Sequence, residues 1–151
     1  MARRPAPVRR WVRLGLVLLV LGWALVFTVA AGLNPYFEDG TPRQMETHRQ
    51  LGLPPCTFKA LTGLPCPSCG MTTSFALLVR GDVWNSVRAN FAGTALALFG
   101  LVFIPWALVT AWTGRVLWIR SVETMLFCLC VLFLVLLLTH WGLALYLRYY
   151  G

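Results

Sequence analysis

Residues 14–33 read LGLVLLVLGWALVFTVAAGL, twenty consecutive residues without a charged side chain. A helix of this length rises about 30 Å, which is the thickness of the hydrocarbon core of a bilayer. Residues 91–113 and 124–147 form two further uncharged runs. Because backbone polar groups in lipid must be satisfied within their own segment, each run predicts a membrane-spanning helix. The sequence therefore predicts a single all-α integral membrane domain with three transmembrane helices.

The composition agrees with lipid as the solvent. Hydrophobic residues make up 58% of the chain and charged residues 12%, against roughly 25% charged in an average soluble domain. The net charge is +8, yet no basic stretch is interleaved with aromatic residues, which argues against nucleic-acid binding. Five basic residues near the start indicate a topology signal that contacts anionic lipids. They are Arg3, Arg4, Arg9, Arg10 and Arg13.

The distribution of Lys and Arg predicts the orientation. Residues 1–13 and 114–123 carry seven basic residues in twenty-three positions, whereas residues 34–90 and 148–151 carry six in sixty-one. By the positive-inside rule, the N-terminus is cytoplasmic and the loop 34–90 is extracytoplasmic in the cell membrane. The alternative is a cleaved secretory signal, because Val29-Ala30-Ala31 resembles a cleavage site. An uncleaved anchor is favoured, since the run is long and two spans follow.

The loop 34–90 carries the chemistry-bearing motif, which is Cys56 followed by Cys66-Pro67-Ser68-Cys69-Gly70. Turn signals predict an irregular segment over 34–42, and short interfacial helices are expected over 43–51 and 72–80. Asp82 is the predicted N-cap of a further helix that can merge with the second span.

These residues also carry a resemblance. The run from Cys56 to Thr72, with Arg80-Gly81-Asp82 and Asn90 downstream, resembles a bacterial family of small, functionally uncharacterised membrane proteins. That family is recognised by the signature C-x9-C-P-x-C-G-x-T-R. The resemblance implies the same arrangement of spans around a cysteine loop and leaves the activity open. Thr73 stands where the signature has Arg.

Three roles for the cysteines stay open. In the redox role, Cys66 is the nucleophile at the start of a helix, Cys69 resolves the mixed disulfide, and Cys56 is a third exchangeable thiol. In the metal role, the three cysteines and His48 form a Cys3His zinc site. In the structural role, a disulfide joins Cys56 to Cys66 or Cys69 and ties the loop, leaving one thiol over.

Other polar residues have supporting roles. Thr72, Thr73 and Ser74 are expected to cap the first turn of the helix that follows Gly70, and Gly70 lets the chain pass close to the cysteines. The alternative is that Gly70-Met71-Thr72 lines a site in which the helix N-terminus faces an anion or a thiolate. His140 lies within the third run, where a packing role is favoured over a ligand or proton-carrying role. Cys128 and Cys130 are two apart on a helix, cannot bridge each other, and are expected to be packing residues.

The pattern favours an accessory or partner-binding membrane subunit, acting with a membrane protein partner or as a homo-oligomer. The chain has no phosphate-binding glycine loop, no H-E-x-x-H and no G-x-S-x-G motif, and this favours a protein that is not an enzyme. The alternative is a thiol–disulfide redox or zinc-binding membrane protein that uses Cys56, Cys66 and Cys69, and the sequence leaves open whether zinc or no cofactor is bound.

Overall fold

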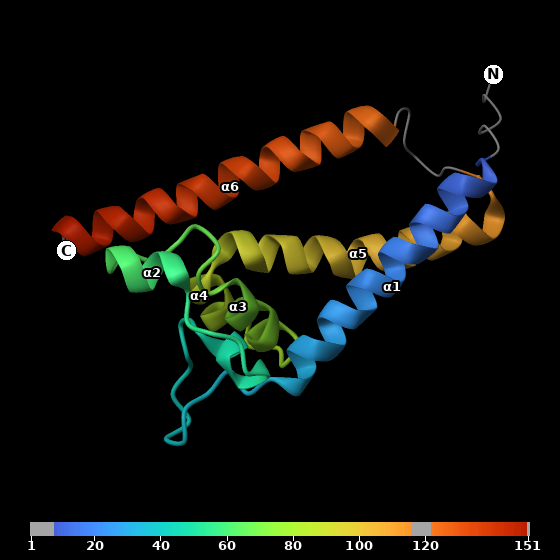
Figure 1. The fold of residues 1–151 in the computed structure, drawn as a ribbon. Helices are drawn as coiled ribbons and strands as arrows, with labels where there is room; N and C mark the ends of the chain where they lie inside the picture. The colour runs from blue at the N-terminus through green and yellow to red at the C-terminus, as the bar shows by residue number, and fades with distance from the viewer. Residues whose placement is uncertain (1–7, 116–121, 151) are drawn as a thin grey trace.

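The computed structural model describes residues 8–115 and 122–150, with backbone alone for 122–126 and 148. Arg3, Arg4 and Arg120, which entered the orientation argument, lie outside the described residues. The regular structure in the described part of the chain is helical, apart from isolated bridge residues such as the pair Tyr36 and Pro42, which confirms the all-α fold (Figure 1). Its elements are α1 (Arg10–Gly32), the 3-10 helix η1 (Thr47–Leu51), α2 (Thr57–Thr62), α3 (Met71–Leu78), α4 (Val83–Ala89), α5 (Phe91–Thr113) and α6 (Val122–Tyr150).

Three helices in the described part of the chain are long and apolar enough to cross a membrane. These are α1, α5 and the part of α6 over Phe127–Leu147, with mean hydropathies of 2.5, 2.0 and 2.4. Helix α1 begins at Arg10, four residues before the predicted run, and α5 covers the predicted residues 91–113. The three-span architecture expected from hydropathy is confirmed, and it indicates a membrane protein.

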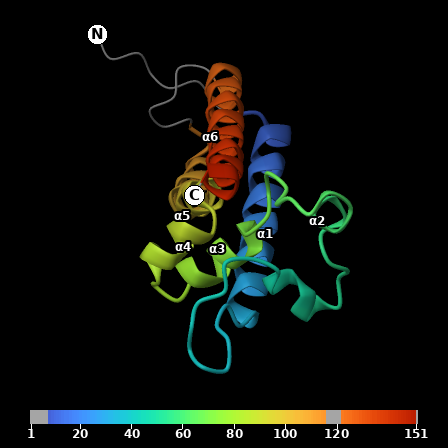
Figure 2. The same ribbon diagram turned by 90° about the vertical axis from the view of Figure 1, so that its left-hand side faces the viewer.

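Helix α3 forms the centre of the packing, between α1, α4 and α5 (Figure 2). Its residues from Thr73 to Leu78 are all buried, so this helix packs inside the protein. The ring of Trp23 on α1 stacks on Phe75 of α3, with centroids 6.3 Å apart. The same indole covers Gly100 of α5, where a Cβ would overlap the ring. A glycine is therefore required where α1 and α5 approach each other.

Arginine side chains tie the helix ends together. Arg13 Nε donates to the carbonyl of Ala111 at 2.7 Å, near the C-terminus of α5. At the other end of α1, Arg80 donates to the carbonyls of Ala30 and Ala31 at 3.4 and 3.1 Å. The last carbonyls of a helix lack intrahelical donors, and a cation there also interacts favourably with the helix dipole. These contacts therefore fix α1 against α5 and α3.

Side-chain caps start both α4 and α5. Asp82 accepts a hydrogen bond from the Asn85 amide at 3.3 Å, as its predicted N-cap role requires. The expectation that this helix merges with the second span is wrong, because Asn90 adopts an extended conformation with φ −164° and ψ 105°. Asn90 Oδ1 accepts from the Gly93 amide at 2.8 Å and starts α5 as a separate helix.

Candidate functional site

Three cysteines from the loop converge. The sulfur atoms of Cys56, Cys66 and Cys69 all lie within 4.8 Å of one another. Cys66 Sγ and Cys69 Sγ are 3.0 Å apart, and all three cysteines are half-buried and reduced. Cys128 and Cys130 lie exposed on α6 and are not part of this group. The cluster therefore joins the three thiols that the sequence singled out.

The convergence depends on α2, a helix that the sequence reasoning missed. Helix α2 follows Cys56 directly and ends at Gly63, which has a φ of 70° and is the C-cap. The chain then returns to Cys66, whose carbonyl accepts from the Cys69 amide at 3.0 Å in a tight turn. In the same turn the Cys66 amide donates to Cys69 Sγ at 3.2 Å. A run of helix formers ended by glycine was the signal available in the sequence.

Gly70 fixes the position of Cys69. It is the N-cap of α3 with a φ of 85°, a conformation that glycine adopts without strain. A Cβ added there would lie 2.8 Å from the Gln44 carbonyl oxygen and closer still to that of Ala89. Asn90 Nδ2 donates to the Cys69 carbonyl at 3.0 Å. The second thiol is thus held against the α4–α5 junction by backbone contacts that admit no side chain at Gly70.

The third span supports the loop from its other side. Trp141 Nε1 on α6 donates to the carbonyl of Pro65, next to Cys66, at 2.8 Å. Its ring meets that of Phe58 on α2 edge-on, with centroids 6.4 Å apart. His140 packs edge-on against Phe91 with centroids 5.0 Å apart and is not part of the thiol group.

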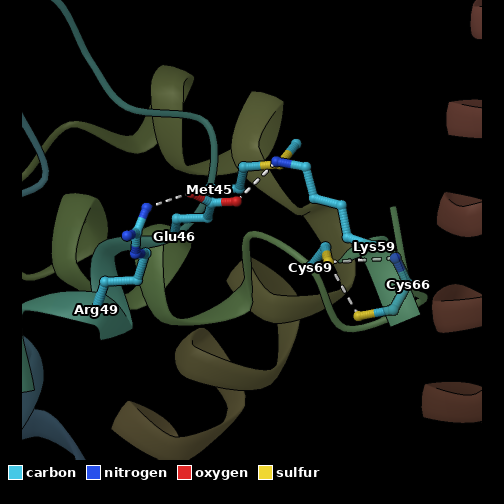
Figure 3. A network of polar contacts seen from close by, with 6 residues as sticks. All are labelled: Met45, Glu46, Arg49, Lys59, Cys66 and Cys69. Atoms are coloured by element: carbon cyan, nitrogen blue, oxygen red, sulfur yellow. Dashed lines mark hydrogen bonds and ion pairs between the residues drawn. The ribbon is translucent and has the colours of Figure 1, made fainter. Parts of the chain in front are cut away.

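An ion pair lies beside the thiols (Figure 3). Lys59 Nζ of α2 donates to Glu46 Oε1 at 2.7 Å and to Met45 Sδ at 3.3 Å. Arg49 lies 3.4 Å from the second carboxylate oxygen of Glu46. The hydrogen bond from Lys59 keeps the pKa of Glu46 below its ordinary value, so this carboxylate is ionised and its charge is compensated.

The two close thiols differ in acidity. Burial acts to raise the pKa of Cys66, but hydrogen bonds from Cys69, Ser68 and Cys56 outweigh burial, and this pKa is lowered. Burial and the hydrogen bond to Cys66 raise the pKa of Cys69 to about 12. Cys66 is therefore the more acidic of the two thiols in the 3.0 Å contact. The pair therefore consists of a thiol that ionises more readily and a neighbour that ionises less readily.

The sulfurs open onto a cavity of about 960 Å³ that runs along α1. His48 lines this cavity but lies outside the group of three close sulfurs. Thr72 lines it too, next to Thr73, which is fully buried and whose hydroxyl lies 2.8 Å from that of Thr47. The cavity thus has polar groups and thiols at one end.

The predicted capping of α3 by Thr72, Thr73 and Ser74 is wrong. The N-cap is Gly70, and no side-chain hydrogen bond caps the helix there. Ser74 Oγ instead donates to the Met71 carbonyl at 2.7 Å, and Thr73 is used in the contact with η1. The Thr73 hydroxyl therefore serves tertiary packing around the site, whereas the Ser74 hydroxyl bonds within its own helix.

Residues 56–104 match the family described as Protein of unknown function (DUF2752). The match begins at the first cysteine of the cluster and extends through α2, α3 and α4 into α5. It agrees with the expected likeness to an uncharacterised family and assigns no activity. No curated protein and no solved structure matches the chain.

Proposed function

We propose that the protein is a membrane thiol–disulfide exchange protein, with Cys66 as nucleophile and Cys69 as resolving thiol. The observation that carries this proposal is the 3.0 Å separation of the two sulfurs at the mouth of a cavity. A disulfide requires about 2.05 Å, so a closing movement of about 1 Å joins the pair. The lowered pKa of Cys66 and the raised pKa of Cys69 support this assignment of roles.

The exchange needs no group beyond the thiols and a partner disulfide. The Cys66 thiolate attacks one partner sulfur, a mixed disulfide forms, and the other partner sulfur leaves and takes up a proton. Cys69 then loses its proton and attacks Cys66 Sγ, which forms the Cys66–Cys69 disulfide and releases the second partner thiol. Two electrons pass from the pair to the partner. The reverse sequence oxidises a partner dithiol.

The third thiol gives the cluster a further route. Cys56 Sγ lies within 4.8 Å of both other sulfurs, so it can attack either of them after oxidation. Exchange between Cys56–Cys66 and Cys66–Cys69 disulfides needs no change in the fold of α3. This accounts for an odd number of cysteines, which a purely structural bridge leaves unexplained.

The partner and the compartment are part of the proposal. The density of basic residues supports an extracytoplasmic loop, where disulfides persist. The exchange function also defines the partner of the accessory role expected from the sequence: it is a protein whose thiols or disulfide react with the Cys66–Cys69 pair. In the span Phe127–Leu147 no residue is buried within the chain, which supports contact of α6 with lipid or with such a partner.

A soft-metal site is the second candidate, and the convergence of three sulfurs favours it. Zinc sites that serve structure take four ligands with Zn–S distances of about 2.3 Å, which places tetrahedral sulfurs about 3.8 Å apart. The described residues offer three close ligands, with His48 outside the group, and the 3.0 Å pair would have to open. The residues fit three-thiolate binding of zinc or Cu(I), with a fourth position facing the cavity.

Differential alkylation in native membranes separates these proposals. The background variant carries Cys128→Ala and Cys130→Ala, so that mass-shifting maleimide reports on the loop cysteines alone. The exchange proposal expects two thiols to be protected in air-exposed membranes and released by reductant, with no effect of chelator. Release of all three by chelator without reductant would overturn it in favour of the metal site. Three free thiols under oxidising glutathione would exclude both.

A further inference from the structure

The cavity beside the thiols continues as a groove along one face of α1. The lining residues on α1 include Leu18, Gly22, Leu25 and Val29, which recur every three or four positions and therefore share a face. From Leu18 to Ala30 the helix rises about 18 Å. The groove therefore extends from the thiols far along the apolar span.

The groove is open sideways to the surroundings of α1. Leu18 is 59% exposed, Leu25 65% and Val26 46%, although all three line the cavity. In a chain whose α1 is apolar enough to cross a membrane, these side chains face lipid. An apolar chain of comparable length can enter from the bilayer and lie along α1.

The head of the groove is polar, and neither Lys nor Arg is among the described residues that line it. Glu46 is the carboxylate that lines it, and Lys59 and Arg49 both bind that carboxylate. The remaining polar groups include the thiols and the hydroxyl of Thr72. A phospholipid phosphate would therefore meet the Glu46 carboxylate and no lining Lys or Arg, whereas a neutral head group avoids this electrostatic penalty.

We propose that this groove binds a lipid-soluble quinone, whose ring reaches the Cys66–Cys69 pair and whose apolar tail lies along α1. The inference rests on the proposed exchange function and supplies its electron acceptor. A quinone combines a long apolar tail with a compact, neutral head that dithiols reduce. Those are the features that the two ends of the groove select.

The step is balanced within the two reactants. The two S–H bonds of Cys66 and Cys69 break, one S–S bond forms between them, and two electrons pass to the quinone. The two protons end on the quinone oxygens, which gives one quinol per disulfide. The oxidised pair then passes its disulfide to a partner dithiol by the exchange described above.

Gly22 and Gly15 provide a matched pair of variants. A side chain at Gly22 would project into the groove, and no atom lies within 4 Å of a Cβ built there. Gly15, two turns away on the same helix, is equally open but lines a different cleft, between α1, α5 and α6. Gly22→Phe therefore fills the proposed site, while Gly15→Phe adds the same side chain elsewhere.

The test uses the reduced full-length chain in detergent with a decyl-substituted benzoquinone and the same ring without its tail. We expect quinol formation with a stoichiometry of one per Cys66–Cys69 disulfide. The tailed quinone should react at least about tenfold faster at low concentration, since burial of two methylene groups already gives about that factor in affinity. Gly22→Phe should remove this advantage, and Gly15→Phe should keep it.

Diamide, a water-soluble thiol oxidant, separates failure of the quinone site from failure of the exchange function. If diamide forms the Cys66–Cys69 disulfide but the two quinones react equally, or Gly22→Phe reacts like the wild type, the groove does not bind quinone. The groove is a lipid site instead if added phospholipid abolishes the faster reaction of the tailed quinone in the wild type, while neither the tail nor phospholipid changes the rate of Gly22→Phe. If diamide forms no such disulfide, the proposed function itself is wrong.

Discussion

Replacing Gly70 with alanine tests whether the backbone geometry of this residue holds the thiol pair in place. Gly70 has a φ of 85°, and an alanine Cβ would meet backbone oxygen atoms of Gln44 and Ala89, which cannot rotate away. The left-handed conformation alone costs a non-glycine residue about 1–2 kcal/mol. Overpacking against fixed atoms adds about 1–3 kcal/mol. The free energy of unfolding should therefore fall by about 2–5 kcal/mol.

Gly81 is the matched control, because its φ is 80° and no atom lies within 4 Å of a Cβ built there. Gly81→Ala should cost only the conformational part, about 1–2 kcal/mol. Both variants can be compared by SDS titration in mixed micelles, with tryptophan fluorescence as the measure of unfolding. The Cys66 alkylation rate should change in Gly70→Ala and stay at the wild-type value in Gly81→Ala. Equal losses of stability in the two variants would refute the packing argument.

Two further outcomes follow from the hydrogen bonds of the site. Ser68→Ala removes a contact that lowers the pKa of Cys66, so this pKa should rise. Because less thiolate is then present at neutral pH, iodoacetamide should alkylate Cys66 more slowly, and the alkylation rate should reach half its maximum at a higher pH. An unchanged pH profile would contradict the role of Ser68. Thr47→Val leaves the buried Thr73 hydroxyl without its partner and should cost about 1–3 kcal/mol of unfolding free energy. The double variant with Thr73→Val should cost less than the sum of the single variants, and strict additivity would argue against the bond.

The spans could be predicted from the sequence because hydropathy and length dominate in lipid. The uncharged run 91–113 coincides with α5. The start of α1 at Arg10 was not predicted, since Arg13 is accommodated by carbonyls of α5 that lie ninety-eight and ninety-nine residues away along the chain. The break between α4 and α5 was missed as well, because a single side-chain cap at Asn90 decides it.

Only part of the candidate site could be predicted from the sequence. The spacing of Cys56, Cys66 and Cys69 drew attention to the loop, but their convergence depends on α2 and on the bond from Trp141 to Pro65. The second of these contacts joins segments that are seventy-six residues apart. The groove along α1 has no local signal, because every apolar span carries residues such as Leu18 on all its faces. Tertiary contacts therefore decide what the motif can do.

A redox titration of the purified chain against glutathione buffers tests the central claim most directly. The fraction of the Cys66–Cys69 disulfide is measured by acid quenching, alkylation and mass spectrometry of the peptide that contains both cysteines. We expect one two-electron transition that persists in Cys56→Ser and is absent in Cys66→Ser and in Cys69→Ser. If both thiols stay reduced across the whole range of buffers, or if the transition requires Cys56 and survives the loss of Cys69, the Cys66–Cys69 pair is not the redox centre.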